Sequence, residues 1–516
     1  MLSREDNELL TRTGPGTAMG ALLREYWMPV VESKELLPGG RVKRVMLLGE
    51  RLIVFRGTGG RAGLIGEFCP HRSASFYYGR VEESGMRCAY HGWRFGLDGQ
   101  CLEMPSEPPE SSFAGKVTHT AYPCVEKGGV VWAYMGAASP PPPLPELEFT
   151  LLPEGHTFLS RRVQDCNWFQ ALEGGIDSSH ISFLHAPIDH RDRAVTEDMD
   201  RVSFGVGAAV STGDRAPRFE VVDTDYGVLI GARRTNPDGR WYWRITQFLL
   251  PFYTMPPTDL DERVVQSHIW VPMDDTHVVN WMVTWHPDRR LTREEIALHI
   301  EGKGAHVCDY APATSEPYGD VRTAANRDND YFMDWEAHRT RMYCGIPGFG
   351  VQDQAVQESQ GAIVDRSQER LGSSDTAIIH VRRRLMAAAR ALRDQRTPAP
   401  GSNPRSFLVR STSVVLAPGE SWIEGARARR CRVAVDGDTF VSAVPQVRWL
   451  VGDADLHRWR GQLDYWVFLD GELGQVAGSV NGDAAEIKPA ALLGTIELRL
   501  TATDRDKDLV IPAPRP

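Results

Sequence analysis

Residues 69–71 read Cys-Pro-His and residues 88–91 read Cys-Ala-Tyr-His, so two cysteine–histidine pairs are separated by residues 72–87. Within each pair, the thiol and the imidazole are close enough in sequence to be presented by one loop. Two thiolates and two imidazoles can hold a [2Fe–2S] cluster in which the cysteines bind one iron and the histidines bind the other. The predicted cluster ligands are Cys69, His71, Cys88 and His91.

A structural zinc site is the alternative, because two cysteines and two histidines also suit Zn²⁺. Zinc fingers usually place the two cysteines together and the two histidines together in sequence. Here each half of the pattern holds one residue of each type, so each loop can supply one ligand to each iron. This mixed order favours the iron–sulfur cluster.

The bulk composition is that of an ordinary globular chain: 516 residues, 42% of them apolar and 24% charged, enough for about three domains. The formal charge of −10 argues against nucleic acid as a main partner. No apolar run reaches the length of a membrane span, and the N-terminus lacks the apolar core of a signal peptide. We therefore expect a cytoplasmic protein without a membrane partner.

The predicted fold class is α+β, beginning with an N-terminal arm at residues 1–40. Short apolar runs and glycine turns over residues 41–140 predict a small antiparallel β domain that carries the cluster loops. Five prolines between Ala137 and Glu148, four of them consecutive, mark a stiff boundary after this domain.

Residues 150–420 are predicted to form a second domain of helices and an antiparallel sheet. A helix is expected at Ser374–Gln395, and the strand-like runs that would line a pocket are 228–230, 241–246, 264–271 and 278–285. Residues 421–516 predict a β-rich C-terminal extension of unknown role, with hairpin turns at Asp436-Gly437 and Asp470-Gly471.

A second group of metal-binding residue types follows the proline-rich boundary. Glu173, Asp177, His180 and His185 form the pattern E-x3-D-x2-H-x4-H. On an ideal helix Asp177 and His180 share a face, whereas His180 and His185 lie about 140° apart. Both histidines can reach one metal only if the helix ends or distorts between them. The pattern is weak alone, but beside a histidine-ligated cluster it predicts a mononuclear metal site.

Together the two patterns resemble the large α subunit of the Rieske non-haem iron ring-hydroxylating oxygenases. Segments 167–185, 352–361 and 365–372 are similar to the phthalate 4,5-dioxygenase branch, and the resemblance covers about residues 15–415. It implies an N-terminal antiparallel β Rieske domain and a catalytic domain of helices plus an antiparallel sheet. The implied cofactors are a [2Fe–2S] Rieske cluster and a mononuclear Fe(II).

Carried over residue by residue, the resemblance makes His180, His185 and Asp353 the ligands of the mononuclear iron. Two imidazoles and one carboxylate form a facial triad that leaves positions open for O₂. Glu358 and Asp365 compete with Asp353 for the carboxylate role. Glu358 lies five positions further on and would sit about 140° round a helix from Asp353.

Asp177 resembles the bridging carboxylate of the family, which joins a Rieske histidine of one subunit to an iron ligand of the next. In this chain it would connect His91 across an interface with His180, in a homotrimer or a stacked hexamer. The alternative is that Asp177 only orients His180 by a hydrogen bond, and the two roles are compatible.

The resemblance implies a terminal oxygenase that uses O₂ and electrons to hydroxylate or O-dealkylate an aromatic substrate. Typical substrates are aryl carboxylates and aryl ethers, and in the resembling branch an FMN/[2Fe–2S] reductase supplies electrons from NADH. Arg244 lies among aromatic residues and is either a bidentate ligand for a substrate carboxylate or a surface arginine. The rival interpretation is a Rieske-type electron carrier or redox sensor without oxygenase activity. The substrate and the choice between mono- and dioxygenation stay open.

Overall fold

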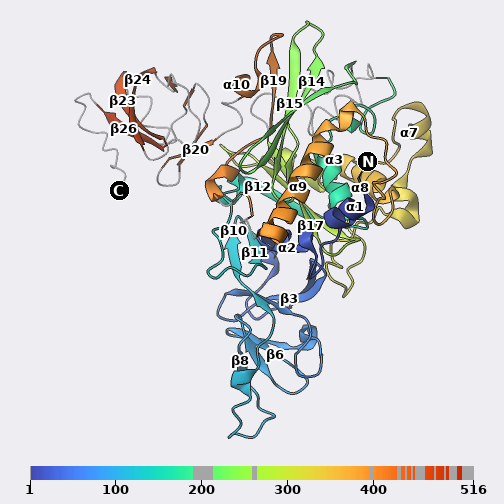
Figure 1. Ribbon diagram of the computed structural model, residues 1–516, viewed down its shortest axis with the longest axis vertical. Helices are drawn as coiled ribbons and strands as arrows, with labels where there is room; N and C mark the ends of the chain where they lie inside the picture. The colour runs from blue at the N-terminus through green and yellow to red at the C-terminus, as the bar shows by residue number, and fades with distance from the viewer. Residues whose placement is uncertain are drawn as a thin grey trace.

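The computed structural model describes residues 2–189, 213–258, 264–395, 399–401 and 403–426, and beyond these only the strands between 432 and 502. Figure 1 shows a narrow lower part made of short strands and a broader upper part built around long strands and helices. The lower part corresponds to the predicted cluster domain, and the upper part to the predicted catalytic domain.

Three small antiparallel sheets build the N-terminal part. The first sheet has the order β1 (Trp27–Glu32), β11 (Val130–Tyr134), β10 (Cys124–Lys127). The second has the order β2 (Lys43–Leu47), β3 (Glu50–Arg56), β4 (Ala62–Gly66), β9 (Ala121–Tyr122). The third has the order β5 (Arg80–Glu82), β6 (Gly85–Arg87), β7 (Arg94–Gly96), β8 (Cys101–Glu103).

The two cysteine–histidine loops leave this framework after β4 and after β6. A small apolar core lies beneath them and includes Ile53, Ile65, Phe76 and Phe95, all fully buried. Cys69 and Cys88 belong to the same buried cluster of side chains. The antiparallel β domain predicted around the cluster loops is therefore confirmed.

An eight-stranded antiparallel sheet forms the upper part (Figure 1). Its order is β12-β18-β17-β16-β15-β14-β13, and β19 pairs with β15 beside this path. The bounds are β12 (Thr157–Gln164), β13 (Arg218–Asp223), β14 (Gly227–Thr235), β15 (Trp241–Leu249), β16 (Tyr253–Met255), β17 (Val265–Pro272), β18 (Val278–Trp285) and β19 (Thr412–Leu416). Every residue of β17 and β18 is buried, and the strand-like runs at 264–271 and 278–285 predicted both strands.

Three helices matter for the site: α3 (Trp168–Ile176), α8 (Phe349–Ser359) and α9 (Thr376–Gln395). Helix α3 packs against β16 and β17, and α8 packs against α3. Asn167 caps α3, because its side chain accepts a hydrogen bond from the backbone N–H of Phe169. Helix α9 is the helix predicted for Ser374–Gln395. The shorter helices are α6 (Arg293–Ile300), α7 (Trp335–Thr340) and α10 (Trp422–Gly425).

The segment predicted as an N-terminal arm contains α1 (Arg4–Thr11) and α2 (Ala18–Arg24), both of which pack against α9. Leu10, Leu22 and Leu23 are fully buried in the main core. Strand β1 then enters the first sheet, so the N-terminal segment joins the two parts of the molecule.

The C-terminal extension is β-rich, as predicted. Its strands are β20 (Arg432–Val435), β21 (Thr439–Ser442), β22 (Gln446–Val447), β23 (Arg460–Leu469), β24 (Glu472–Asn481), β25 (Ala484–Glu486) and β26 (Glu497–Ala502). The predicted turns at 436–437 and 470–471 lie outside the described residues.

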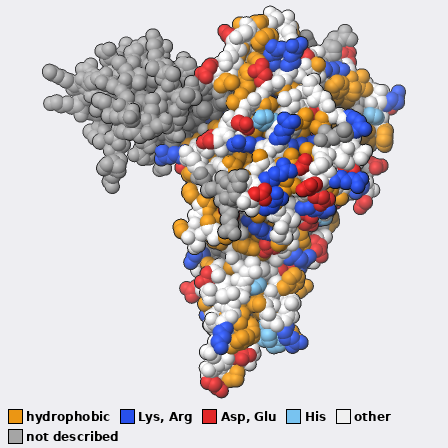
Figure 2. All heavy atoms as spheres, viewed as in Figure 1, with side chains coloured by type: hydrophobic (Ala, Val, Ile, Leu, Met, Phe, Trp, Pro, Cys, Tyr) orange, Lys and Arg blue, Asp and Glu red, His pale blue; other side chains and the backbone are white. Residues whose placement is uncertain are grey.

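The described surface carries charges of both signs. On the face drawn in Figure 2, basic and acidic side chains of the described residues are intermingled. Among the same residues, no helix combines the length and the apolarity needed to cross a membrane.

Candidate metal centres

The two cysteine–histidine loops have the same local geometry. The N–H of Ser73 donates to the carbonyl of Cys69 (2.9 Å), and the N–H of Gly92 donates to the carbonyl of Cys88 (3.1 Å). Both donors follow their cysteine by four residues and have positive φ, 57° for Ser73 and 76° for Gly92. A left-handed residue closes each loop, so the two cysteines start equivalent turns.

The four predicted ligands of the cluster lie together at the ends of these loops. Cys69 and Cys88 are buried, and the rings of His71 and His91 are 4.6 Å apart. Burial, together with the neighbouring Cys88, raises the pKa of the Cys69 thiol to about 11. The Cys69 thiolate is favoured only when a positive charge such as a metal ion lies next to it, so the donor set fits a metal group.

Trp93 shields the histidine side of this group. Its ring stacks on His71 at 4.3 Å with an interplanar angle of 7°, and its Nε1–H donates to Ser106 Oγ (3.1 Å). Trp93 is 4% exposed, so it belongs to the core while covering one ligand.

The spread of the four side chains also bears on the zinc alternative. A single tetrahedral zinc draws all its ligand atoms to 2.0–2.3 Å from the metal, and therefore close to one another. Within the described part of the chain, a group of three potential ligands with atoms all within 4.8 Å of one another occurs at His180, His185 and Asp353, and not at the two loops. A binuclear cluster accommodates the wider spread of the cysteines and histidines.

The second site is built where helix α3 stops. The helix ends at Ile176, Asp177 follows it directly, and a 3₁₀ turn runs over His180–Ser182. This break is the condition that the sequence pattern requires for His180 and His185 to face one point. Their ring centroids lie 5.0 Å apart.

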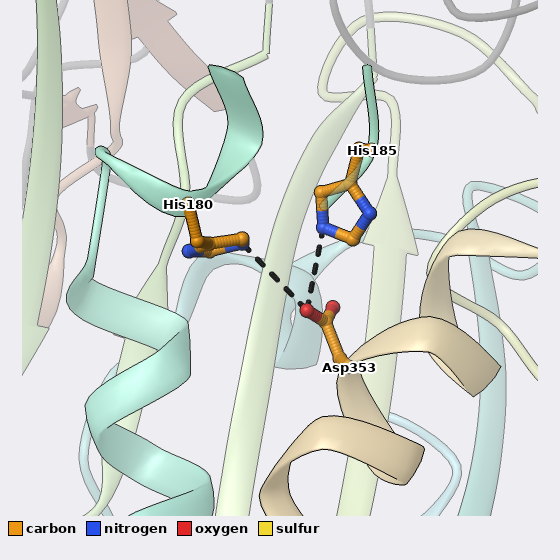
Figure 3. A group of neighbouring side chains, drawn as sticks. All are labelled: His180, His185 and Asp353. Carbon is orange, nitrogen blue, oxygen red and sulfur yellow. Dashed lines mark ion pairs between the residues drawn. The ribbon is translucent and has the colours of Figure 1, made fainter. Parts of the chain in front are cut away.

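Asp353 completes this group from helix α8. Its Oδ1 lies 3.3 Å from His185 Nε2 and 3.6 Å from His180 Nε2. Figure 3 shows the three side chains converging from the segment after α3 and from α8. Burial alone would raise the pKa of Asp353, but the two histidines lower it to about 2. One carboxylate and two imidazole Nε2 atoms thus offer three ligands to one metal ion.

Neither competitor of Asp353 lies in this group. Glu358 Oε1 accepts hydrogen bonds from the Asp165 N–H and from Gln354, and its Oε2 accepts one from Tyr331. Asp365 is exposed and accepts hydrogen bonds from the backbone and side chain of Ser367. Both carboxylates are engaged elsewhere.

The Nδ1 atoms of the two histidines have different partners. His180 Nδ1 lies 3.3 Å from Asp177 Oδ2, whereas His185 Nδ1 lies 2.7 Å from Gln352 Oε1. Burial opposes charge on both His180 and Asp177, but their mutual attraction prevails and raises the pKa of His180 while lowering the pKa of Asp177. Asp177 therefore has the position of a group that orients His180.

A cavity of about 70 Å³ adjoins the three converging side chains, with Asp177, Arg244, Thr246, His268, Trp270 and Phe349 in its wall. Arg244 lies on β15, is 3% exposed, and donates from Nη2 to the Pro257 carbonyl (3.1 Å). It is thus a buried residue of the pocket and not a surface arginine. Burial lowers the pKa of His268 to about 4, so this side chain is neutral at pH 7.

Two residues that position the histidine segment were not predicted from the sequence. Arg234 on β14 donates to the carbonyl and hydroxyl of Ser178 and so clamps the segment between Asp177 and His180. Gln352 holds His185 from the residue directly before Asp353. Nothing in the local sequence marks either residue, because the partners are far apart along the chain.

Glu173, the first carboxylate of the E-x3-D-x2-H-x4-H pattern, is absent from the metal group. It is buried and forms ion pairs with Arg366 (2.8 Å) and Arg382 (2.6 Å). These pairs tie α3 to α9 and to the segment after α8. Glu173 therefore stabilises the framework that carries the histidines.

Two protein families match consecutive parts of the chain. Residues 26–123 match the family described as Rieske [2Fe-2S] domain, and residues 133–423 match the family described as LigXa C-terminal domain like.

The chain is also similar to curated proteins over most of its length. It is 37% identical over 406 residues to the 3-chlorobenzoate-3,4-dioxygenase oxygenase subunit of Comamonas testosteroni, covering 78% of this chain and 92% of that protein. It is 38% identical over 416 residues to the phthalate 4,5-dioxygenase oxygenase subunit of Pseudomonas putida, covering 76% and 87%.

Among solved structures, the terminal oxygenase of carbazole 1,9a-dioxygenase from Nocardioides aromaticivorans IC177 superposes with a TM-score of 0.50. The sequence identity is 20%, and the match covers 73% of this chain and 98% of that one. At this identity the likeness concerns the fold, and it agrees with the β domain followed by the helix-plus-sheet domain.

Proposed function

The chain belongs to the Rieske non-haem iron ring-hydroxylating oxygenases as an oxygenase α subunit, and on that basis we propose that it oxidises an aryl carboxylate. The reaction class is hydroxylation, with O-dealkylation of an aryl ether as the second candidate. The observation that carries the proposal is the convergence of His180, His185 and Asp353 beside a pocket that contains a buried arginine. An electron carrier or sensor, the rival interpretation, would use only the cluster and would have no need for this second site.

The family membership supplies the two cofactors, and we propose which residues hold them. Cys69 and Cys88 bind one iron of the cluster, and His71 and His91 bind the other. His180, His185 and Asp353 bind the mononuclear Fe(II). When bound, the cluster transfers electrons and the mononuclear Fe(II) activates O₂ for insertion into the substrate.

The pocket residues explain why an anionic aromatic substrate is proposed. Arg244 places a buried guanidinium in the wall of the cavity, and Arg234 lies near enough that their mutual repulsion adds to burial in lowering the pKa of Arg234 to about 10. A substrate carboxylate would relieve this repulsion and pair with Arg244 through charge-assisted hydrogen bonds. Trp270 and Phe349 offer apolar surface to the ring. The names of the two similar curated proteins, acting on chlorobenzoate and phthalate, support the same substrate class.

We propose that the active assembly is a homotrimer or a stacked hexamer. Strand β6, next to a cluster loop, lies at the far end of the molecule from α3 and α8 (Figure 1). Electrons would therefore come from the cluster of a neighbouring copy, with Asp177 between His91 of that copy and His180. The electron donor would be an FMN/[2Fe–2S] reductase that oxidises NADH, and the location would be the cytoplasm.

The domain division is likewise proposed as residues 1–40, 41–140, 150–420 and 421–516. Strand β1, at the end of the first segment, pairs with β11 of the Rieske domain. A Rieske domain expressed alone should therefore include β1.

Oxygen uptake by the purified oxygenase, with a reductase and NADH, tests the function. The assay uses a panel of aryl carboxylates and their neutral amides, with products identified by mass. We expect uptake coupled to oxygen incorporation into an acid but not into its amide. Equal turnover of amides and acids would overturn the carboxylate proposal, and no product from any aromatic compound would overturn the oxygenase proposal.

A further inference from the structure

The imidazole of His185 has a glutamine side chain as its Nδ1 partner, whereas that of His180 has an aspartate. The family resemblance gives no role to this glutamine. His185 Nδ1 lies 2.7 Å from the side-chain carbonyl of Gln352, and both residues are 3% exposed. At the other end of the same amide, Gln352 Nε2 donates to the backbone carbonyl of Ile346 (2.8 Å). The Gln352 side chain thus bridges a metal-binding histidine and the loop before α8.

These two contacts fix the orientation of the amide. Because the Ile346 carbonyl can only accept a hydrogen bond, the NH₂ group of Gln352 must face it, and Oε1 must face the imidazole. Oε1 is an acceptor, so Nδ1 of His185 carries the proton. In the neutral imidazole that binds a metal, the lone pair is then on Nε2, which lies 3.3 Å from Asp353 Oδ1. The hydrogen-bond network therefore selects the tautomer that binds metal through Nε2.

The start of α8 places Gln352 next to His185. The helix begins at Phe349 after Gly348, whose φ of 84° suits glycine. Gln352 and Asp353 are consecutive on the first turns of the helix. Asp353 therefore offers its carboxylate as a ligand, while Gln352 holds the imidazole of His185. Gln352 also ties this turn back to Ile346 just before the helix.

The charge of the partner matters as well as its position. His180 faces the carboxylate of Asp177, whereas His185 faces a neutral amide. With Asp353 as the third ligand, two carboxylates balance the charge of one divalent ion. A glutamate at position 352 would add a third negative charge to a buried site.

We propose that Gln352 is a positioning residue that fixes His185 as the Nδ1–H tautomer and presents its Nε2 atom to the mononuclear metal. This rests on the proposed function, because it takes His180, His185 and Asp353 as the ligands. Hydrogen-bond partners of ligating histidines typically contribute about 10–100-fold to metal affinity. Gln352 would supply this contribution without adding charge.

Cobalt binding to the intact protein tests the proposal without measuring turnover. The protein keeps its cluster, the mononuclear metal is removed, and Co²⁺ is titrated while its d–d absorption is followed. We expect Gln352→Met to weaken Co²⁺ binding about 10–100-fold relative to wild type, while the absorption of the cluster is unchanged. Gln352→Glu restores the acceptor and should bind Co²⁺ more tightly than Gln352→Met.

Gln354→Met is the matched control. Gln354 lies on the same helix, is 2% exposed, and donates to Thr323 (3.0 Å) and Glu358 (2.9 Å) rather than to a histidine. Its substitution removes similar hydrogen bonds from the same helix and should leave Co²⁺ affinity near that of wild type. Equal weakening by Gln352→Met and Gln354→Met would assign the effect to the helix and overturn the proposal, as would wild-type affinity of Gln352→Met.

Proton NMR of the cobalt-loaded protein provides a second readout. Wild type should show two exchangeable, paramagnetically shifted imidazole N–H signals, one from each histidine. Gln352→Met should lose one of them, or broaden it by exchange with water, and retention of both sharp signals would overturn the tautomer assignment. Failure of the proposed function gives a different result, because cobalt binding would then be insensitive to His185→Ala as well.

Discussion

His180 Nδ1 lies 3.3 Å from Oδ2 of Asp177, immediately beyond the last residue of helix α3. The other carboxylate oxygen, Oδ1, accepts the N–H of Ser179 at 2.7 Å. Asp177 is therefore held by the backbone of the turn while it holds the ring, which explains how a short, irregular segment can present a histidine with a defined orientation.

Replacing Asp177 by asparagine tests this arrangement. The amide has the same shape but no charge, so it holds the imidazole less strongly and, across a subunit boundary, would also weaken the contact with His91. We expect oxygenase activity to fall by about 10–100-fold or more, with the cluster absorption unchanged. Steady-state oxygen uptake and visible spectroscopy measure the two properties. Wild-type activity in Asp177→Asn would contradict both roles of Asp177.

Removing one ligand of the mononuclear iron should not disturb the cluster. His180→Ala, or Asp353→Ala, is expected to lower the iron content from three to two atoms per chain and to abolish substrate oxidation, because we propose that His180, His185 and Asp353 jointly hold the third iron. Iron analysis together with the cluster spectrum checks this. Simultaneous loss of cluster and mononuclear iron would indicate a single interdependent metal network.

Arg244→Met should raise the KM for an aryl carboxylate much more than it changes kcat. A charge-assisted hydrogen bond is worth about 1.5–3 kcal/mol, which corresponds to about 10–150-fold in binding. Arg240→Met is the matched control, because Arg240 lies just before the same strand and pairs with Asp238 at an exposed turn. Kinetics on an acid and its amide measure the effect. An equal rise of KM for both compounds would show that Arg244 does not recognise the carboxylate.

The pair formed by Glu35 and Arg161 predicts an acid-sensitive contact between the N-terminal segment and β12. Arg161 Nη2 lies 2.7 Å from Glu35 Oε2, and Lys43 pairs with the same carboxylate. Burial opposes ionisation, but Arg161 and Lys43 lower the pKa of Glu35 to about 2. A carboxyl with a lowered folded-state pKa stabilises the fold above its unfolded pKa near 4.5. That stability is lost as the pH falls from about 4.5 toward 2.

Glu35→Gln leaves the buried guanidinium of Arg161 without its main partner and should cost about 3–5 kcal/mol at pH 7. The loss should shrink below pH 4, where the wild type also weakens. Thermal unfolding across this pH range measures both effects. Glu336→Gln is the control, since the pair of Glu336 with Arg339 is exposed and should contribute little. An equal effect of the two substitutions would contradict the importance of burial.

The sequence predicted β17 and β18 because both strands are buried along their whole length and are therefore mainly apolar. Both strands are rich in apolar and aromatic residues, although Gln266, Ser267 and His268 interrupt the apolar run in β17. Proline and glycine predicted a domain boundary and several turns for similarly local reasons. The packing of α1 and α2 on α9 could not be predicted, because it joins segments more than three hundred residues apart.

The same distinction between local sequence signals and long-range contacts applies to the site. Cysteine–histidine spacing is a local signal and predicted the cluster loops, whereas Asp353 came only from the family resemblance. Gln352 and Arg234 were missed because their partners lie 167 and 56 residues away in the chain. Glu173 was placed in the metal pattern by its spacing, yet the fold turns it toward Arg366 and Arg382.

Strand β6 lies far from helices α3 and α8 in Figure 1, and this separation can be tested by combining two variants in one oligomer. If each catalytic unit combines the cluster of one copy with the iron of the next, two different inactive variants can restore activity when they assemble together. Co-expressing His71→Ala with His180→Ala should yield mixed oligomers that regain part of the activity, since some boundaries join an intact cluster to an intact iron site. Each variant alone should have no oxygenase activity. A mixture that is also inactive would mean that electrons do not cross between copies.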